Sequence, residues 1–209
     1  MNSRKKYFKE ESPKAEILYA ALEEFVQFGK KGARMQSIAD RAGVNKALLH
    51  YYFSSKENLH REVLRRMFEN AFTGISASIQ EATEPRDQVR ELIERYYDFI
   101  STFPELPRLM LHEINTNPEE IASFFSTVFI GVNHYPQTIL GVIRNGIEKQ
   151  QFRDVDPKQF LITTLSSILF FFGGKPLLTA VLEIDDEAEF IRQRKQHVLD
   201  VLLTYLERE

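Results

Sequence analysis

The sequence predicts an all-α fold, with an N-terminal three-helix helix-turn-helix domain and a larger C-terminal helical bundle. Apolar residues recur at helical spacing through most of the 209 residues, and residues 36–57 fit two short helices around a glycine turn. No segment has the alternating pattern of a strand, and no repeat or low-complexity tract is present. We expect a first domain over residues 1–55 and a second over residues 56–209.

The first helix is expected to begin at Ser12 and Pro13, a capping residue followed by a first-turn proline, and to end at Gly29. Its apolar stripe consists of Ile17, Leu18, Ala21, Leu22, Phe25 and Phe28. We expect this stripe to cover a core formed by Met35, Ile38, Val44, Leu49, Tyr52 and Phe53. An ordinary three-helix packing unit has the same core, so only the exposed residues distinguish a functional surface.

Gly43 and Asn45 indicate a helix-turn-helix within residues 36–57, QSIADRAGVNKALLHYYFSSKE. Gly43 can adopt the left-handed conformation that the turn requires, because it has no Cβ. Asn45 can cap the second helix of the motif with its side-chain oxygen.

The second helix of the motif is expected to bury one edge at Leu49. At about 100° per residue, the buried side also holds Tyr52 and Phe53. The opposite side and its flanks hold Ala47, Tyr51, Leu48 and His50. That side is left for a DNA groove.

The remaining helices form a bundle with short connections. A long helix runs from Lys56 to about Ala82 without a flexible linker after the motif, and others are expected over about 86–103, 105–115, 118–150, 157–182 and 186–207. Pro136 is expected to kink the segment 118–150 near Asn133. The run from Gly173 to Pro176 is expected to break the segment 157–182.

Charge is distributed unevenly along the chain. Residues 1–66 hold 14 Lys and Arg against 8 Asp and Glu, a net charge of +6, whereas the remainder holds 13 against 22, a net charge of −9. A basic head on an acidic body is typical of polyanion binding, although a solvated basic face gives the same count. The chain has no cysteine and its charged start lacks the apolar stretch of a signal peptide, so we expect a cytoplasmic protein.

The run from Ile38 to Leu59, IADRAGVNKALLHYYFSSKENL, resembles the TetR/AcrR family of bacterial transcriptional regulators, whose usual pattern is IAxxAGVSxGTLYxYFxSKExL. The chain departs from that family at Arg34, Asn45 and His50, where a capping Thr or Ser, a Ser and a phosphate-binding Tyr are usual. The resemblance implies a homodimeric regulator, more often a repressor, that binds a palindromic double-stranded DNA operator. It also implies a small apolar or amphipathic effector held in the second domain.

Contacts with the operator divide into phosphate contacts, which fix the register, and base contacts, which carry sequence information. The residues assigned to phosphates are Lys46, His50, Lys56 and Arg34. The residues expected in the groove are Ala47, Leu48 and Tyr51, of which the first two can read thymine methyl groups. The full set expected at the DNA also includes Gln36, Ser37 and Asn45.

Aromatic residues are abundant in the second domain, where they are either plain core or the lining of an apolar pocket. The family resemblance implies such a pocket. The residues expected to line it are Phe68, Phe72, Phe99, Phe103, Met110, His112, Glu113, Phe125, Phe129, Asn133 and Phe171.

The last two long segments resemble the dimerisation helices of the family, although their apolar stripes would also serve intramolecular packing. The residues expected in the dimer interface are Phe160, Thr164, Ile168, Phe190, His197, Val198, Val201, Leu202 and Tyr205.

Other functions are weakly supported by the sequence. The apolar stretch from Leu161 to Leu182 contains polar residues, two glycines and a proline, which disfavours a membrane span. The five histidines lack paired metal-ligand spacing, and His112-Glu113 has no nucleophile beside it, so no metal, cofactor or enzymatic activity is expected. The alternative is a ligand carrier or cofactor-free enzyme that retains a regulator-like head.

Overall fold

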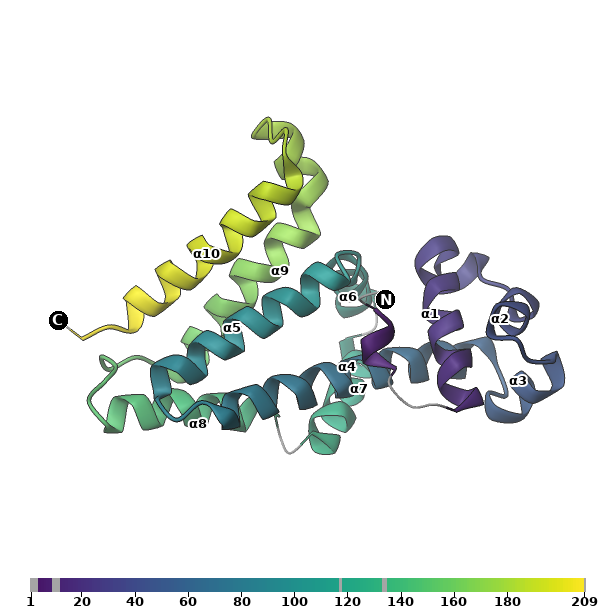
Figure 1. Cartoon of the computed structure of the whole chain (residues 1–209), viewed down its shortest axis with the longest axis horizontal. Helices are drawn as coiled ribbons and strands as arrows, with labels where there is room; N and C mark the ends of the chain where they lie inside the picture. Colours follow the sequence, from purple (N-terminus) through teal and green to yellow (C-terminus); the bar gives the residue numbers. More distant parts are fainter. Residues whose placement is uncertain (1–3, 9–11, 117, 133–134, 209) are drawn as a thin grey trace. The chain divides into compact units, whose positions relative to one another are not determined.

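The computed structural model describes residues 4–8, 12–116, 118–132 and 135–208, apart from the side chains of His112 and Glu113. These residues form a short 3₁₀ helix, η1 (Lys5–Tyr7), and ten α-helices (Figure 1). The α-helices are α1 (Pro13–Gly32), α2 (Met35–Ala42), α3 (Lys46–Tyr52), α4 (Lys56–Glu81), α5 (Pro85–Thr102), α6 (Leu106–Thr116), α7 (Pro118–Gly131), α8 (Tyr135–Glu148), α9 (Pro157–Val181) and α10 (Glu187–Leu206). The prediction of an all-α fold is confirmed.

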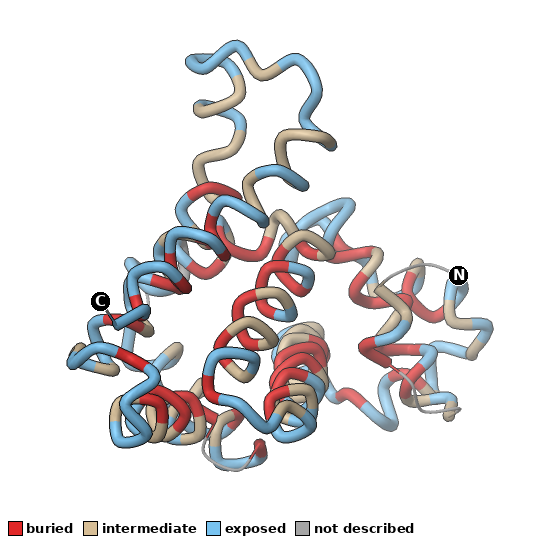
Figure 2. Tube along the Cα trace, turned by 60° about the vertical axis from the view of Figure 1, so that its left-hand side comes forward, coloured by how far each residue is buried: buried red, intermediate tan, exposed pale blue. Residues whose placement is uncertain are grey.

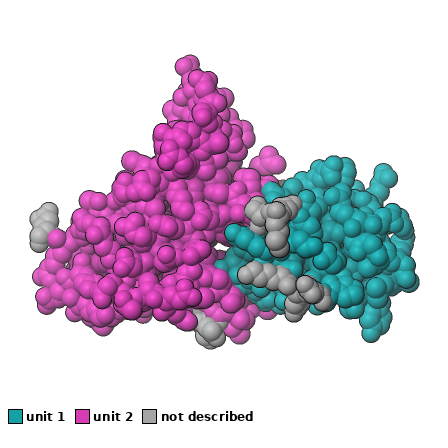
Figure 3. All heavy atoms as spheres, in the orientation of Figure 1, with its two compact units in different colours: residues 1–71 teal, residues 72–209 magenta. Residues whose placement is uncertain are grey.

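The chain divides into two compact units, unit 1 (Met1–Ala71) and unit 2 (Phe72–Glu209), which Figure 3 colours separately. The division falls inside α4 and not at residue 55, because the first turns of α4 pack within unit 1. The ring of His60 lies 4.8 Å from that of Phe25, and the Asn70 side-chain amide donates to the Tyr7 carbonyl at 2.5 Å.

Helix α1 begins as its sequence predicts and carries the core of unit 1. The Ser12 hydroxyl accepts the Ala15 N–H at 3.2 Å, and Pro13 occupies the first turn. The regular helix ends at Gly29, whose φ of 66° and ψ of 168° are not helical, and one further turn follows to Gly32. Phe28 is 50% exposed and is therefore not part of the core stripe.

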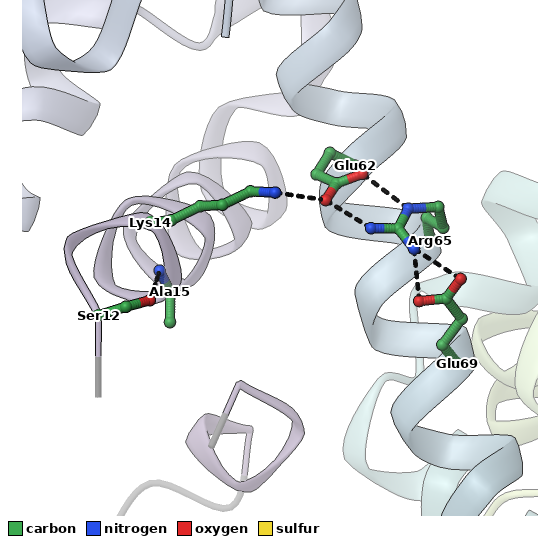
Figure 4. Close-up of polar contacts among 6 residues, drawn as sticks. All are labelled: Ser12, Lys14, Ala15, Glu62, Arg65 and Glu69. Carbon is green, nitrogen blue, oxygen red and sulfur yellow. Dashed lines mark hydrogen bonds and ion pairs between the residues drawn. The ribbon is translucent and has the colours of Figure 1, made fainter. Parts of the chain in front are cut away.

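A polar network connects α1 to α4 (Figure 4). The Arg65 guanidinium donates to both carboxylate oxygens of Glu62 at 2.7 and 2.6 Å, and to Glu69 at 2.6 Å. The Lys14 ammonium lies 3.2 Å from the Glu62 carboxylate. Burial raises the pKa of Glu62, but hydrogen bonds from Arg65 and Lys14 outweigh it and leave that pKa below its ordinary value.

In unit 2, α5 packs against α8, α9 and α10 and carries most of the largest buried side chains. Those on α5 and just after it are Ile93, Tyr97, Phe99, Ile100 and Phe103, each at most 1% exposed. Figure 2 shows how buried and exposed residues alternate along the helices. The buried Tyr97 hydroxyl donates to the Ile191 carbonyl of α10 at 2.9 Å, and burial raises the pKa of Tyr97 to about 12.

The end of α8 shows why a glycine stands at position 146. A Cβ built on Gly146 would lie 2.1 Å from the ring of Phe152, which is 4% exposed. The Arg153 N–H donates to the Leu206 carbonyl at 3.0 Å. The segment after α8 is thereby held against the end of α10.

Two expectations for the bundle are wrong. Residues 118–150 form two helices, α7 and α8, and not one kinked helix. Pro136 is the second residue of α8, where its missing N–H breaks no helical hydrogen bond. The predicted kink position, Asn133, lies outside the described residues.

Helix α9, by contrast, continues through the run from Gly173 to Pro176. A proline inside a helix removes one hydrogen bond, but tertiary packing can hold the helix together. Here α6 packs on α9, and a Cβ at Gly173 would lie 3.5 Å from Leu111 and 3.7 Å from Pro107. This packing accounts for the continuous helix.

Candidate functional site

The helix-turn-helix in unit 1 has the local geometry that the sequence predicts. Gly43 ends α2 in the left-handed conformation, with a φ of 68°. The Asn45 side-chain oxygen accepts the Leu48 N–H at 2.8 Å and caps α3. Leu49 is fully buried and Phe53 is 4% exposed, so one edge of α3 faces the core.

The opposite edge of α3 is open to solvent. Lys46, Ala47, His50 and Tyr51 are exposed, and Tyr51 reaches 81% exposure. Leu48 is half-buried. A short helix with one buried edge and one exposed edge of mixed basic, apolar and aromatic residues has the form of a major-groove recognition helix.

One core prediction for this helix is wrong, since Tyr52 is 38% exposed. It is the last residue of α3, and its ring meets that of Tyr51 edge to face, with centroids 5.5 Å apart. The predicted core residues Met35 and Val44 are half-buried, whereas Ile38 is fully buried.

The amino end of α2 carries three of the residues expected at DNA. Arg34 and Gln36 are exposed, and the Gln36 amide donates to Asp40 at 2.8 Å. Ser37 is half-buried, and its hydroxyl donates to the Glu24 carboxylate at 2.8 Å. Arg34 occupies the N-cap position of α2, where its side chain makes no capping hydrogen bond.

Lys56, expected at a phosphate, also has partners within the chain. Its ammonium donates to the carbonyl oxygens of Lys31 and Ala33 at 3.1 and 3.2 Å. These bonds fix the turn that leads into α2, so Lys56 has a structural role besides any phosphate contact.

Sequence reasoning missed Glu24. It is 2% exposed, and among the described residues it and Thr164 are the buried polar or charged side chains. Its carboxylate accepts the Arg34 N–H at 3.3 Å and lies 3.5 Å from the Arg41 guanidinium. The available signal was its position seven residues after Ile17 and three after Ala21, on the buried stripe of α1.

In unit 2, aromatic rings gather in several groups. The ring of Phe72 stacks on that of Tyr135 at 4.4 Å and lies 5.6 Å from that of Phe129, which in turn stacks on Phe125 at 5.5 Å. Phe99 and Phe103 form a second pair at 5.5 Å. The structure therefore brings three of the residues expected at the ligand together in the first group.

The other residues expected at the ligand do not all join these groups. Phe171 packs against Phe172 and Phe190, at 5.1 and 5.7 Å. Met110 is 8% exposed in α6, and Phe68 is buried in unit 1. The side chains of His112 and Glu113, together with Asn133, lie outside the described residues.

Tyr135 supplies a polar atom within the first group, although it is not among the residues expected at the ligand. Its hydroxyl is buried and has no hydrogen-bond partner among the described residues, and the same holds for the hydroxyls of Ser76 and Ser101. Burial raises the pKa of Tyr135, and the neighbouring Tyr96 raises it further. The phenol is therefore a neutral hydrogen-bond donor at physiological pH.

The residues expected in the dimer interface differ in burial. Five are at most 3% exposed and are turned into the core of their own chain: Phe160, Thr164, Ile168, Val198 and Leu202. His197, Val201 and Tyr205 are exposed, and Phe190 is half-buried. The burial of the first five corrects the expectation that the whole stripe faces a partner.

Further exposed apolar side chains lie on α9 and just after it. They are Ile162, Phe170, Leu177, Val181 and Leu182, each at least 57% exposed. Helix α9 is long and apolar enough to cross a membrane by length and composition alone. Exposed apolar side chains that gather on one helix are typical of an interaction surface.

Metal binding finds no support in the part of the chain that the structure describes, where no group of three or more His, Asp or Glu residues could hold an ion. The side chains of His112 and Glu113, a candidate general base and its partner, lie outside the described residues.

Comparison with known proteins agrees with this geometry. Residues 17–63 match the bacterial regulatory proteins of the tetR family, and residues 85–202 match the tetracyclin repressor-like C-terminal domain. RutR of Escherichia coli (strain K12), an HTH-type transcriptional regulator, is 28% identical over 193 residues, which are 91% of this chain and 88% of RutR.

FasR of Mycolicibacterium smegmatis, an HTH-type transcriptional activator, is 34% identical over 110 residues. The match covers 53% of this chain and 50% of FasR, so the chain spans about half the length of that relative. The crystal structure of FadR from Bacillus subtilis in complex with stearoyl-CoA has a TM-score of 0.70 at 15% identity, covering 92% of this chain and 98% of FadR. The likeness to FadR extends over both units and concerns the fold.

The two matched profiles together cover the helix-turn-helix and most of unit 2, and the second alone covers more than half of the chain. The relatives are transcriptional regulators, not enzymes. The chain therefore belongs to the TetR family of bacterial regulatory proteins and is a DNA-binding transcriptional regulator.

Proposed function

We propose that this regulator is a cytoplasmic homodimeric repressor that binds a pseudo-palindromic operator and is released by a small, largely apolar ligand. The observation that carries the proposal is the open edge of α3, where Ala47 and Tyr51 stand opposite the buried Leu49. Such an edge can enter the major groove. Repression is the simplest result, because a protein that occupies a promoter excludes other proteins without needing a further contact.

At the operator, the residues of unit 1 divide by chemistry. The apolar Ala47 and the half-buried Leu48 suit thymine methyl groups, and the Tyr51 hydroxyl can bond a base edge or a phosphate. The exposed Lys46, His50 and Arg34 suit phosphates. The remaining proposed contacts, which lie at the ends of α2 and α3 and the start of α4, are Gln36, Ser37, Asn45 and Lys56.

We propose that two copies associate through the exposed apolar residues of α9 and α10. Val201 is 52% exposed and Tyr205 is 48% exposed, whereas the residues that follow them, Leu202 and Leu206, are buried. The Tyr205 ring is supported from within the chain by Phe160 and by Arg153, whose guanidinium lies 3.7 Å from the ring centroid. A two-fold dimer matches the symmetry of a palindromic site.

For the ligand, we propose the aromatic group around Phe72, Phe129 and Tyr135, with the Tyr135 hydroxyl as the donor that orients a polar atom. A ligand with an apolar body and one hydrogen-bond acceptor fits this chemistry. FadR, which shares the fold, holds stearoyl-CoA, a ligand with a long apolar chain. That complex supports an apolar effector here, and it does not identify one.

The test uses duplex DNA that the full-length protein selects from a random-sequence library. We expect the selected sequences to contain two inverted half-sites, and affinity to fall steeply with salt as phosphate contacts release counterions. Sedimentation with the selected duplex should give two protein chains per duplex. Selected sequences without an inverted repeat, or a complex with one protein chain per duplex, would contradict the proposal. Repression is tested by transcription in vitro from a promoter that carries the selected site, where added protein should lower the amount of transcript.

A further inference from the structure

The turn before α2 is held from two sides by side chains that lie outside it. From α1, the Glu24 carboxylate accepts the Arg34 N–H at 3.3 Å. From α4, the Lys56 ammonium donates to the carbonyls of Lys31 and Ala33. Neither Glu24 nor Lys56 belongs to α2 or α3, yet together they fix where α2 begins.

Glu24 supports the amino end of α2, whose N-cap residue provides no capping side chain. The first N–H groups of a helix lack partners within the helix, and a Ser, Thr, Asp or Asn at the N-cap normally supplies one. The N-cap residue of α2 is Arg34, whose guanidinium can only donate hydrogen bonds. The Glu24 carboxylate, from a neighbouring helix, accepts the backbone N–H of Arg34 itself, which is the bond that the Glu of a capping box makes. A negative charge at this end of α2 is also favoured by the helix dipole.

The same carboxylate reaches both ends of α2. Its second oxygen accepts the Ser37 hydroxyl at 2.8 Å in the first turn and lies 3.5 Å from the Arg41 guanidinium in the last turn. Arg41 also donates to Gln27 of α1 at 3.4 Å. Because Glu24 is 2% exposed, these partners are what compensates its burial, and any rotation of α2 about α1 would break them.

We propose that Glu24 is a positioning residue for DNA recognition: it orients α2 on α1 so that the exposed Arg34 and the amino end of α2 meet the phosphate backbone while α3 enters the groove. Its carboxylate touches no DNA in this arrangement, because it is buried in unit 1. The inference rests on DNA binding by the helix-turn-helix and is independent of the ligand and of repression.

The sign of one substitution separates this role from simple electrostatics. Glu24→Gln removes a negative charge from a DNA-binding unit, which by charge alone would strengthen binding to a polyanion. It also leaves the Arg34 N–H, the Ser37 hydroxyl and the Arg41 guanidinium with fewer acceptors. If the carboxylate positions α2, the substitution weakens binding instead.

The matched control is Glu16→Gln, on the same helix. Glu16 is exposed and pairs with Lys5 at 3.2 Å, so the substitution removes the same charge without touching α2. Both variants are measured by fluorescence anisotropy on the duplex selected by the unaltered protein, across a series of salt concentrations. The temperature is set where circular dichroism shows all proteins fully folded.

We expect Glu24→Gln to weaken binding by about tenfold or more and to lower the salt slope by about 1, because a phosphate contact at the amino end of α2 is lost. Glu16→Gln should bind as tightly as the unaltered protein, or slightly more tightly, with the same slope. A Glu24→Gln protein that binds like Glu16→Gln would overturn the proposal.

Ser37→Ala tests the same positioning role of Glu24 without changing the charge. If Glu24→Gln does not fold, Ser37→Ala is the variant that tests the proposal. Loss of a neutral serine contact to DNA leaves the salt slope unchanged, whereas displacement of Arg34 lowers it. A lowered slope in Ser37→Ala supports positioning through Glu24, and an unchanged slope overturns it. In the folded double variant, Ser37→Ala should add nothing to the effect of Glu24→Gln.

Discussion

The ammonium of Lys56, the first residue of α4, donates to the Ala33 carbonyl at 3.2 Å, immediately before α2. A cation that the sequence assigns to a phosphate is therefore also bonded to the backbone of its own chain. An ammonium has three protons, so two bonds to the carbonyls of Lys31 and Ala33 leave one for a phosphate oxygen.

Substitution of Lys56 should consequently have two effects, whereas substitution of Lys46 should have one. Lys46→Ala removes an exposed charge at the start of α3 and is expected to lower the salt slope by about 1 without changing the unfolding temperature. Lys56→Ala is expected to lower the slope similarly and to destabilise unit 1 by about 1–3 kcal/mol, because charge-assisted hydrogen bonds are lost. Salt-dependent anisotropy and thermal unfolding measure the two effects separately. Both variants should weaken all operator sequences about equally, and a changed base preference with an unchanged slope would contradict the phosphate assignment.

The network around Glu62 predicts a dependence of stability on pH. The pKa of Glu62 is lower in the folded protein, so its ionised carboxylate stabilises the fold above its unfolded pKa. This contribution is lost as the pH falls below the ordinary value of 4.5 and through the folded pKa. The difference in free energy of unfolding between the unaltered protein and Glu62→Gln should therefore shrink toward acid. A difference that stays constant from neutral pH to below the folded pKa would rule out this contribution of Glu62.

The dimer interface can be tested at Val201, which is exposed, and not at Leu202, which is buried. Val201→Asp places a charge on the proposed apolar interface and should give a folded monomer, with operator affinity greatly reduced. Leu202→Asp should instead unfold unit 2, because the charge would lie in its core. Sedimentation and circular dichroism distinguish the two results. Val26→Asp changes another exposed valine in the same way and should leave the protein dimeric. A Val201→Asp protein that is still dimeric would show that the interface does not include Val201.

Features of the helix-turn-helix that depend on residues close together in the sequence could be predicted from the sequence. The positive φ of Gly43, the cap at Asn45 and the buried edge at Leu49 follow from residue type and helical period, and all three are confirmed. The buried role of Glu24 and the bonds from Lys56 to Lys31 and Ala33 depend on partners 10 to 25 residues away. Helical spacing places such residues on a face and does not say what lies across from it.

The same distinction explains the errors in unit 2. An apolar stripe identified α9 and α10, but it could not separate Leu202, which packs on its own chain, from Val201, one position along. The continuous α9 depends on packing by Pro107 and Leu111 around Gly173, residues more than 60 positions earlier. The helix propensities of proline and glycine are measured in isolated helices and therefore do not include such tertiary contacts.

Tyr135→Phe should separate ligand binding from stability. The Tyr135 hydroxyl is buried without a partner among the described residues, so replacing it with hydrogen removes an unsatisfied polar group. We expect the ligand-free variant to be more stable by about 1 kcal/mol, with a raised unfolding temperature. If the hydroxyl orients the ligand, the variant should bind acceptor-bearing ligands more weakly. Unchanged ligand affinity in Tyr135→Phe would exclude the hydroxyl from the site.

The proposed release by ligand requires that ligand and operator oppose each other. Helix α4 runs from Lys56 in unit 1 to Glu81 in unit 2, and Phe72, the first residue of unit 2, lies on it and stacks on Tyr135. A ligand among these rings changes DNA affinity only if it binds the DNA-competent and incompetent states differently. A displacement of α4 would alter the separation of the two recognition helices of a dimer, which must match about 34–36 Å or a multiple on B-DNA.

Thermodynamic linkage makes this coupling measurable from either side. We expect an apolar ligand, found by screening fatty acids and substituted aromatic acids for a raised unfolding temperature, to weaken binding of the selected duplex. The duplex should weaken binding of that ligand by the same factor, because the coupling free energy is shared. Calorimetric titrations of the ligand into protein with and without duplex give one factor, and anisotropy with and without ligand gives the other. Equal ligand affinities in the two titrations would mean that the rings around Phe72 serve packing and carry no signal to the DNA-binding unit.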